Sequence, residues 1–159
     1  MMIPKIKKIL YTTDLSQNST YVLRYAFNTA EMHDAEINIM HVSEFSVTSF
    51  PDSLAIGITP EDKSSILMTI RKRLDDFIQK ELGEKERKDK RISTILVAEG
   101  NPVVEILKTA DELKADVIIM GTHSKGIIAH TFLGSVAAEV LQRSRIPVFI
   151  VPFPKVSNM

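Results

Sequence analysis

The sequence predicts an α/β fold: a single doubly wound, five-stranded parallel sheet flanked by helices. Two observations carry this prediction. Short apolar runs alternate with amphipathic helical stripes along the chain, and most of these runs lack the polar alternation of a half-exposed strand. The implied order β-α-β-α-β-α-β-α-β favours right-handed crossovers between parallel strands, with helices on both faces of the sheet.

The strands are expected at five positions. Four apolar runs predict buried strands: Ile6–Thr12, Ile37–Val42, Val117–Met120 and Val148–Val151. The fifth, Ile92–Val97, is β-branched and partly alternating, which is typical of an edge strand. In a doubly wound sheet, ligands bind beyond the carboxyl ends of the strands where the winding reverses. The residues after Thr12 and Met120 are therefore expected to flank a site.

Helical stripes lie between the strands. Apolar residues recur with helical spacing in four segments: Val22–Ala30, Leu67–Ile78, Val103–Ala110 and Gly134–Gln142. Ser16 is a candidate cap for the first helix, and Gly83 is placed to end the second. Asn101 followed by Pro102 predicts a capped start for the third helix.

Composition limits the class of protein. The length of 159 residues predicts a single domain over residues 1–159, with a long variable connection over about residues 43–60. The 20 basic and 20 acidic residues balance, which argues against a nucleic-acid partner. No cysteine is present, so thiolate metal sites and cysteine nucleophiles are excluded. No run is apolar enough to span a membrane, and a cytoplasmic location is expected.

The segment from Gly121 to Ser135 holds the residues most suited to binding an anion. Gly121 directly follows a strand, and Gly134-Ser135 opens the next helix. Glycines let the backbone approach a phosphate, and a helix start supplies unpaired N–H groups and the positive end of the dipole. An ordinary strand-to-helix loop with turn glycines accounts for the same residues equally well.

Several segments resemble the universal stress protein family. They are DVIIMGTHSKG (116–126), FLGSVAAEVLQRSRIPVFIVP (132–152), KKILYTTDLS (7–16), His41-Val42 and Gly100-Asn101-Pro102. The resemblance implies a Rossmann-like sheet, of the adenine nucleotide alpha hydrolase-like type, and a homodimer paired through the last strand, Val148–Val151. It also implies an adenine nucleotide, ATP or another, with or without Mg²⁺. No metal site formed by the protein alone is expected.

The resemblance implies a set of nucleotide-binding residues. Thr12, Asp14 and Val42 are expected on the adenine and ribose side, and Gly121, Gly134, Ser135 and Val136 beside ribose and phosphates. Met120, Thr122, His123, Ser124, Lys125 and Gly126 complete the expected site. Ser124 stands where the pattern of ATP-binding members has its second glycine. A serine there either crowds a phosphate and weakens or abolishes binding, or donates a hydrogen bond to that phosphate. The simpler alternative to a ligand-binding role for Asp14 is a turn residue that helps to cap the next helix. The simpler alternative for His123 is an exposed position in a loop.

Three functions follow as hypotheses. The leading one is a homodimeric adenine-nucleotide-binding regulator of a stress response with an unknown protein partner. It has no catalytic residues, and any ATP hydrolysis is slow. The second is a non-nucleotide-binding member of the family that acts as a dimerisation and interaction module. The third, an adenylating ligase, is disfavoured because Ser-Gly-Gly-x-Asp-Ser and His-x-Gly-His motifs are absent.

Overall fold

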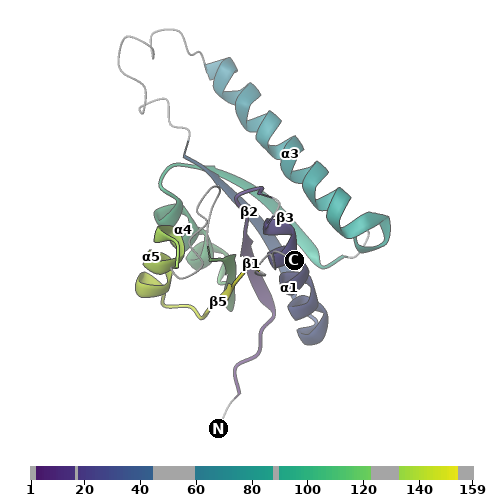
Figure 1. Ribbon diagram of the computed structural model, residues 1–159, viewed down its shortest axis with the longest axis vertical. Coiled ribbons are helices and arrows are strands. Elements are labelled where there is room, and N and C mark those ends of the chain that lie inside the picture. The colour runs from purple at the N-terminus through teal and green to yellow at the C-terminus, as the bar shows by residue number, and fades with distance from the viewer. Residues whose placement is uncertain (1–2, 17, 45–59, 88–89, 123–132, 154–159) are drawn as a thin grey trace, which may run out of the picture.

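Strands and helices alternate along the chain in the computed structural model, which describes residues 3–16, 18–44, 60–87, 90–122 and 133–153 (Figure 1). The strands are β1 (Lys8–Thr12), β2 (Glu36–Ser43), β3 (Ile92–Glu99), β4 (Val117–Gly121) and β5 (Val148–Val151). The helices are α1 (Ser19–His33), α3 (Pro60–Arg87), α4 (Pro102–Leu113) and α5 (Ser135–Arg143). The alternation expected from the sequence is confirmed.

The strands of the described part form one parallel sheet in the order β3-β2-β1-β4-β5. From β1 the chain winds outward through β2 to β3, then crosses back to β4 and β5. The winding therefore reverses between β1 and β4. This order confirms the doubly wound sheet, the edge position of β3 and the predicted switch point.

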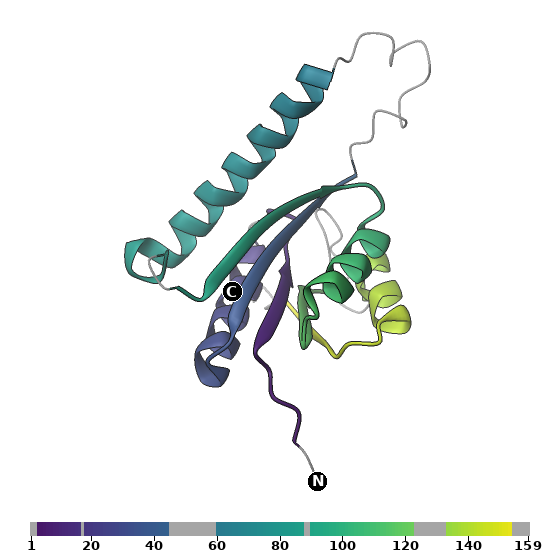
Figure 2. The same cartoon turned by 180° about the vertical axis from the view of Figure 1, so that it is seen from behind.

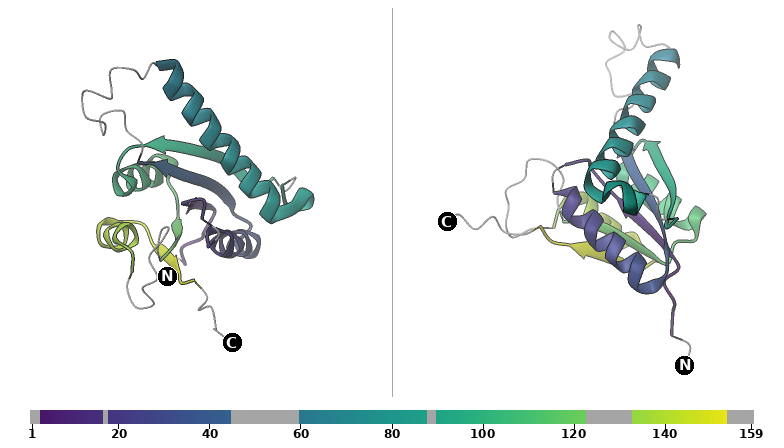
Figure 3. Two further views of the ribbon diagram at one scale, coloured as in Figure 1. Left: turned by 45° about the horizontal axis from the view of Figure 1, so that its top comes forward. Right: turned by 90° about the vertical axis from the view of Figure 1, so that its right-hand side faces the viewer.

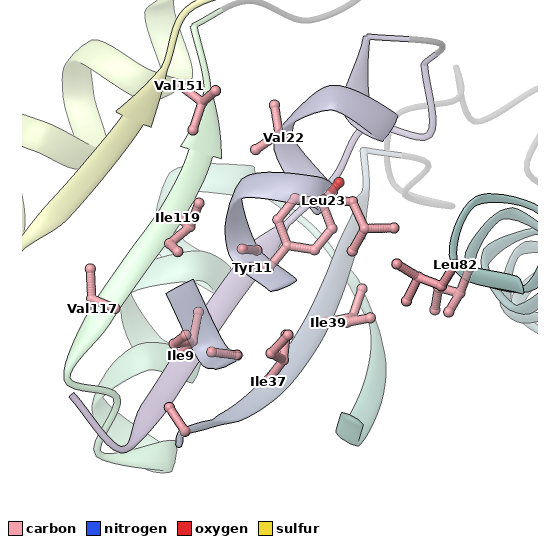
Figure 4. Close-up of a cluster of buried hydrophobic side chains, with 14 of the residues drawn as sticks. Ile9, Tyr11, Val22, Leu23, Ile37, Ile39, Leu82, Val117, Ile119 and Val151 are labelled. Carbon is pink, nitrogen blue, oxygen red and sulfur yellow. The ribbon is translucent and has the colours of Figure 1, made fainter. Parts of the chain in front are cut away.

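Helices cover both faces of the sheet, α1 and α3 on one and α4 and α5 on the other (Figure 2). Alternate side chains of the buried strands supply the two cores. In β1, Ile9 and Tyr11 enter the cluster under α1 and α3, which Figure 4 shows, whereas Leu10 enters the cluster under α4 and α5. The central strands β1 and β4 are buried on both faces, so their runs are largely apolar, which is the pattern that predicted them. Strand β5 was also expected to be buried, but it lies at the edge of the sheet, and of its residues only Val151 is buried.

Helix α3 is longer than the sequence predicted. Its buried residues, Leu74, Ile78 and Leu82, all lie in the half nearer to β3, and the other half extends past the sheet (Figure 3). The prediction that Gly83 ends this helix is wrong, because the helix continues to Arg87. A glycine costs a helix only about 1 kcal/mol relative to alanine. Here the flanking residues are mostly Lys, Glu, Leu and Arg, which are strong helix formers.

Two boundaries differ from expectation for local reasons. Strand β1 begins at Lys8 rather than Ile6, because the Asp116 carboxylate accepts hydrogen bonds from the backbone N–H groups of Lys7 and Lys8, at 2.7 and 2.8 Å. Ser16 does not cap α1, since the N-cap is Asn18, whose side chain makes no capping hydrogen bond. The predicted cap of α4 is confirmed: the Asn101 side chain accepts from the Val104 N–H at 3.1 Å.

The long connection predicted over residues 43–60 begins after Ser43, which is still part of β2. Residues 45–59 lie outside the described part of the chain. No described helix combines the length and apolarity that crossing a bilayer requires.

Candidate functional site

A pocket of about 530 Å³ opens beyond the carboxyl ends of β1 and β4. Its wall combines the loop after β1, the end of β2, the starts of α1, α4 and α5, the end of β4 and the segment after β5. These contributions come from seven separate stretches of the sequence. The parallel sheet brings them together because all its strands end at the same edge.

The loop after β1 is held by its own side chains. The Leu15 N–H donates to Thr13 Oγ1 and the Ser16 N–H to Asp14 Oδ1, both at 3.0 Å. The Ser19 hydroxyl, in the first turn of α1, donates to the same Asp14 oxygen at 2.5 Å. Leu15 takes a left-handed conformation, with φ of 60°, that costs about 1–2 kcal/mol for a residue with a side chain. The Asp14 carboxylate is thereby fixed at the pocket wall.

Tyr11 anchors the start of α1 beneath this loop. It is fully buried, and its hydroxyl donates to the Ser19 carbonyl oxygen at 2.8 Å. Burial raises the pKa of the Tyr11 hydroxyl well above its ordinary range, and the negative charge of Asp14 raises it further. The hydroxyl therefore stays protonated and keeps donating at any physiological pH.

The end of β2 forms the next part of the wall. His41 Nδ1 lies 2.8 Å from the Thr13 carbonyl oxygen. A carbonyl oxygen only accepts, so Nδ1 carries the proton and Nε2 of the neutral ring is an acceptor. Val42, Ser43 and Glu44 follow along the same edge and also line the pocket.

The starts of two helices close the pocket on the α4 and α5 side. Pro102 and Ile106 come from α4, which Asn101 caps. Helix α5 begins after Gly134, whose N–H donates to the Thr122 carbonyl oxygen at 2.6 Å. A glycine has no side chain with which to cap the N–H groups of the first turn. The positive end of the α5 dipole therefore remains available at the pocket, beside the Ser135 hydroxyl.

The charge balance of the described wall is acidic. Its charged side chains are the carboxylates of Asp14 and Glu44, and neither Lys nor Arg is among the described lining residues. Within the described part of the chain, no three His, Cys, Asp or Glu side chains gather as a metal site would need. For an anion, the described wall thus offers backbone N–H groups and hydroxyls rather than cationic side chains.

Gly121 is closely packed by two side chains. Its backbone is not in the left-handed region, where Gly100 is the only described glycine. A Cβ at Gly121 would lie 2.7 Å from Phe153 Cζ and 3.2 Å from Val22 Cγ2. Close approach of these two side chains, rather than an unusual φ, is what requires glycine here.

Nine of the residues expected at the site line this one pocket. They are Thr12, Asp14, Val42, Met120, Gly121, Thr122, Gly134, Ser135 and Val136. The other four, His123, Ser124, Lys125 and Gly126, lie outside the described residues. The lining residues that sequence reasoning missed include Ser19, Glu44 and Phe153. The rule for strand ends puts Phe153 near this edge of the sheet, because it lies just past the carboxyl end of β5, but the rule does not show that its ring enters the pocket wall.

Comparison with known proteins gives consistent relatives. A sequence model described as the universal stress protein family matches residues 5–152. Universal stress protein MJ0531 of Methanocaldococcus jannaschii is 32% identical over 150 residues, covering 94% of this chain and 84% of that protein.

Solved structures share the fold over nearly the whole chain. The structure of MJ0577 from the same organism superposes with a TM-score of 0.74 at 27% identity, covering 95% of this chain and 99% of that one. A universal stress protein in complex with cAMP superposes with a TM-score of 0.56 at 25% identity, covering 93% and 98%.

Proposed function

The chain belongs to the universal stress protein family, and from this premise we propose that it binds an adenine nucleotide in the pocket beyond β1 and β4. One observation supports the proposal above the others. Residues expected at a nucleotide site from four separate sequence segments, 12–14, 42, 120–122 and 134–136, line a single pocket at the switch point of the sheet. Its volume lies within the range of about 300–1,000 Å³ typical of small-molecule sites.

The proposed orientation follows from the polarity of the wall. Asp14 and the end of β2 at Val42 offer acceptors, which suit the exocyclic amine of adenine and the ribose hydroxyls. The start of α5, with Gly134 and Ser135, offers N–H groups and a hydroxyl, which suit phosphate oxygens. The base would thus lie towards β1 and β2, and the phosphates towards α5. A Mg²⁺ ion accompanying the nucleotide would take most of its ligands from phosphate oxygens and water.

We further propose a regulator with little or no hydrolysis. Asp14 accepts two hydrogen bonds from its own loop and from α1, which favours a positioning role over that of a general base for water. Nucleotide binding would then change the surface around the pocket that a partner protein contacts. The whole chain would act as a single domain in the cytoplasm.

A homodimer through β5 is part of the proposal. This strand lies at the edge of the sheet, where unpaired backbone groups can pair with a second copy. Its Phe149 side chain is 40% exposed and packs edge-to-face on Tyr25 of α1, with ring centroids 6.3 Å apart. This exposed aromatic pair also favours the second candidate function, an interaction module that binds no nucleotide.

The test begins with protein purified without added nucleotide. The protein is denatured, any released nucleotide is identified, and the stripped protein is titrated with Mg-ATP, AMP and cAMP by calorimetry. We expect a micromolar dissociation constant for at least one of them, which corresponds to about 8 kcal/mol of binding free energy. Gly134→Trp, which fills the pocket beside α5, should abolish it.

Met32→Trp is the matched control. Met32 is 75% exposed and lies near the end of α1 opposite to the one that reaches the pocket. Met32→Trp also introduces an indole ring, but on an exposed surface away from the pocket, and it should leave the affinity unchanged. No released nucleotide, and no heat with any of the three ligands up to millimolar concentration, would refute nucleotide binding and favour the interaction module.

A further inference from the structure

Phe153 is a pocket residue that neither the motifs nor the expected site contains. It follows β5 by two residues and lines the pocket. Its ring lies directly over Gly121, so closely that a Cβ there would come within 2.7 Å of Cζ and 3.1 Å of Cε1. Real Cβ atoms are not found at 2.7 Å from a carbon, so the ring and the glycine are fitted to each other.

The ring also joins the pocket to the core under α1. Phe153 is half-buried and packs against the cluster that contains Val22 and Val151. Figure 4 shows Val22 of α1 and Val151 of β5 at the same end of that cluster. Gly121 pairs with Val151 across the sheet. The segment after β5 thus turns the ring over the end of β4, towards the first turns of α1.

We propose that Phe153 is the wall that limits the ligand site on the α1 side and so determines which substituted nucleotides it accepts. This inference rests on the proposed function. Ser19 and Val22 line the same side of the pocket, and Ser19 binds Asp14. A ligand group placed between Gly121 and Asp14 therefore meets the Phe153 ring. The ring excludes bulk there and provides a flat apolar surface to a planar group.

Gly121 and Phe153 act as a pair under this proposal. Alanine at position 121 cannot coexist with the ring in its present place and displaces it. Because the start of α1 lies behind the Phe153 ring, the displaced ring moves into the pocket. The affinity for the ligand then falls. Alanine at position 153 removes the closest obstacle and leaves only the Val22 Cγ2 contact at 3.2 Å, so Gly121→Ala should cost much less affinity in that background. The two substitutions are therefore expected to be strongly non-additive.

The experiment is a selectivity measurement by calorimetry on the full chain. The probes are ATP and three bulky analogues: N6-benzyl-ATP, 8-bromo-ATP and ATP carrying an N-methylanthraniloyl group on the ribose. Phe153→Ala should improve the affinity for at least one analogue relative to ATP by about tenfold or more, a difference in binding free energy of about 1.4 kcal/mol. Phe153→Leu, which keeps most of the bulk, should stay near the wild type.

Phe27→Ala is the matched control. It removes the same kind of side chain from α1 at a partly buried position that does not line the pocket, and it should leave the selectivity unchanged. The proposal is overturned if Phe153→Ala and Phe27→Ala give the same selectivity while ATP binding persists. It is also overturned if Gly121→Ala weakens ATP binding equally in the wild-type and Phe153→Ala backgrounds. Failure of the proposed function is distinct: the wild-type chain then binds none of the four probes.

Discussion

Gly100 tests how the wall of the pocket is held in place, because its backbone conformation is one that side chains oppose. It joins β3 to the Asn101 cap of α4, and its φ is +134°. Its N–H donates to the Ser43 carbonyl oxygen at 3.0 Å. A Cβ added there would meet only the Glu105 side chain, at 3.6 and 3.7 Å, which is ordinary contact. The cost of Gly100→Ala is therefore backbone strain alone.

The magnitude follows from two opposing effects. Strain in such a region costs a residue with a side chain about 1–3 kcal/mol. Alanine also restricts the unfolded chain, which offsets about 0.4–1 kcal/mol of that loss. We expect the free energy of unfolding to fall by about 1–2 kcal/mol. With an m-value of about 2 kcal/mol per molar urea, the midpoint of unfolding should fall by about 0.5–1 M.

Gly83→Ala is the control of opposite sign. Gly83 lies inside α3, where alanine is the better helix former by about 0.5–1 kcal/mol. Both variants are unfolded in urea and followed by circular dichroism, with the m-value checked for constancy. If Gly100→Ala unfolds at the wild-type midpoint while Gly83→Ala unfolds at a higher one, the strain argument is refuted.

Three further predictions concern stability. Lys114, at the end of α4, has a left-handed φ of 53°, so Lys114→Gly should raise the free energy of unfolding by about 0.5–1 kcal/mol and the melting temperature by a few degrees. Asp116→Ala should lower the free energy of unfolding by about 1.5–3 kcal/mol, because the carboxylate accepts hydrogen bonds from the N–H groups of Lys7 and Lys8. Asp116→Asn should recover more than half of that loss in the same melting assay. Because burial raises the pKa of Tyr11, the native state keeps a proton that the unfolded state loses above about pH 10, and stability falls as pH rises from there. In urea titrations at pH 10 to 11.5, Tyr11→Phe should make that fall shallower by up to about 1.4 kcal/mol per pH unit, and an identical slope would contradict the assignment.

The sheet could be predicted from the sequence because burial on both faces leaves a plain signal. Runs such as Val117–Gly121 are apolar without alternation, and the connecting stripes have helical spacing. Helix ends were less predictable where a single residue was the only signal. Glycine is common at helix ends, yet the strong helix formers on both sides of Gly83 outweigh that preference. Ser16 lay close enough to be a cap, but its hydroxyl lies beside Ser19 instead, at 3.4 Å.

The candidate site was predictable as far as one rule reached. Strand ends meet at one edge of a parallel sheet, so the positions of Asp14 and Gly121 followed from the strand order, whereas Val42 came only from the family resemblance. Phe153 did not follow, because its place depends on how a short segment turns after β5, and no local pattern specifies that turn. The packing around Gly121 was not predicted for a related reason: a glycine in sequence does not show whether a ligand or a side chain approaches it.

The central position of β1 has a kinetic consequence. This strand leaves the ribosome before the other described strands, yet its partner β4 lies about 100 residues later, with Ile9 opposite Val117. Closing so long a loop is entropically costly, and parallel sheets with such distant partners fold slowly. Until β4 arrives, β1 has only β2 beside it and the pocket has no far wall. A nascent or truncated chain that ends before β4 would therefore lack the pocket even with β1 and β2 paired. Ligand binding would then show that β4 has been synthesised and has paired with β1.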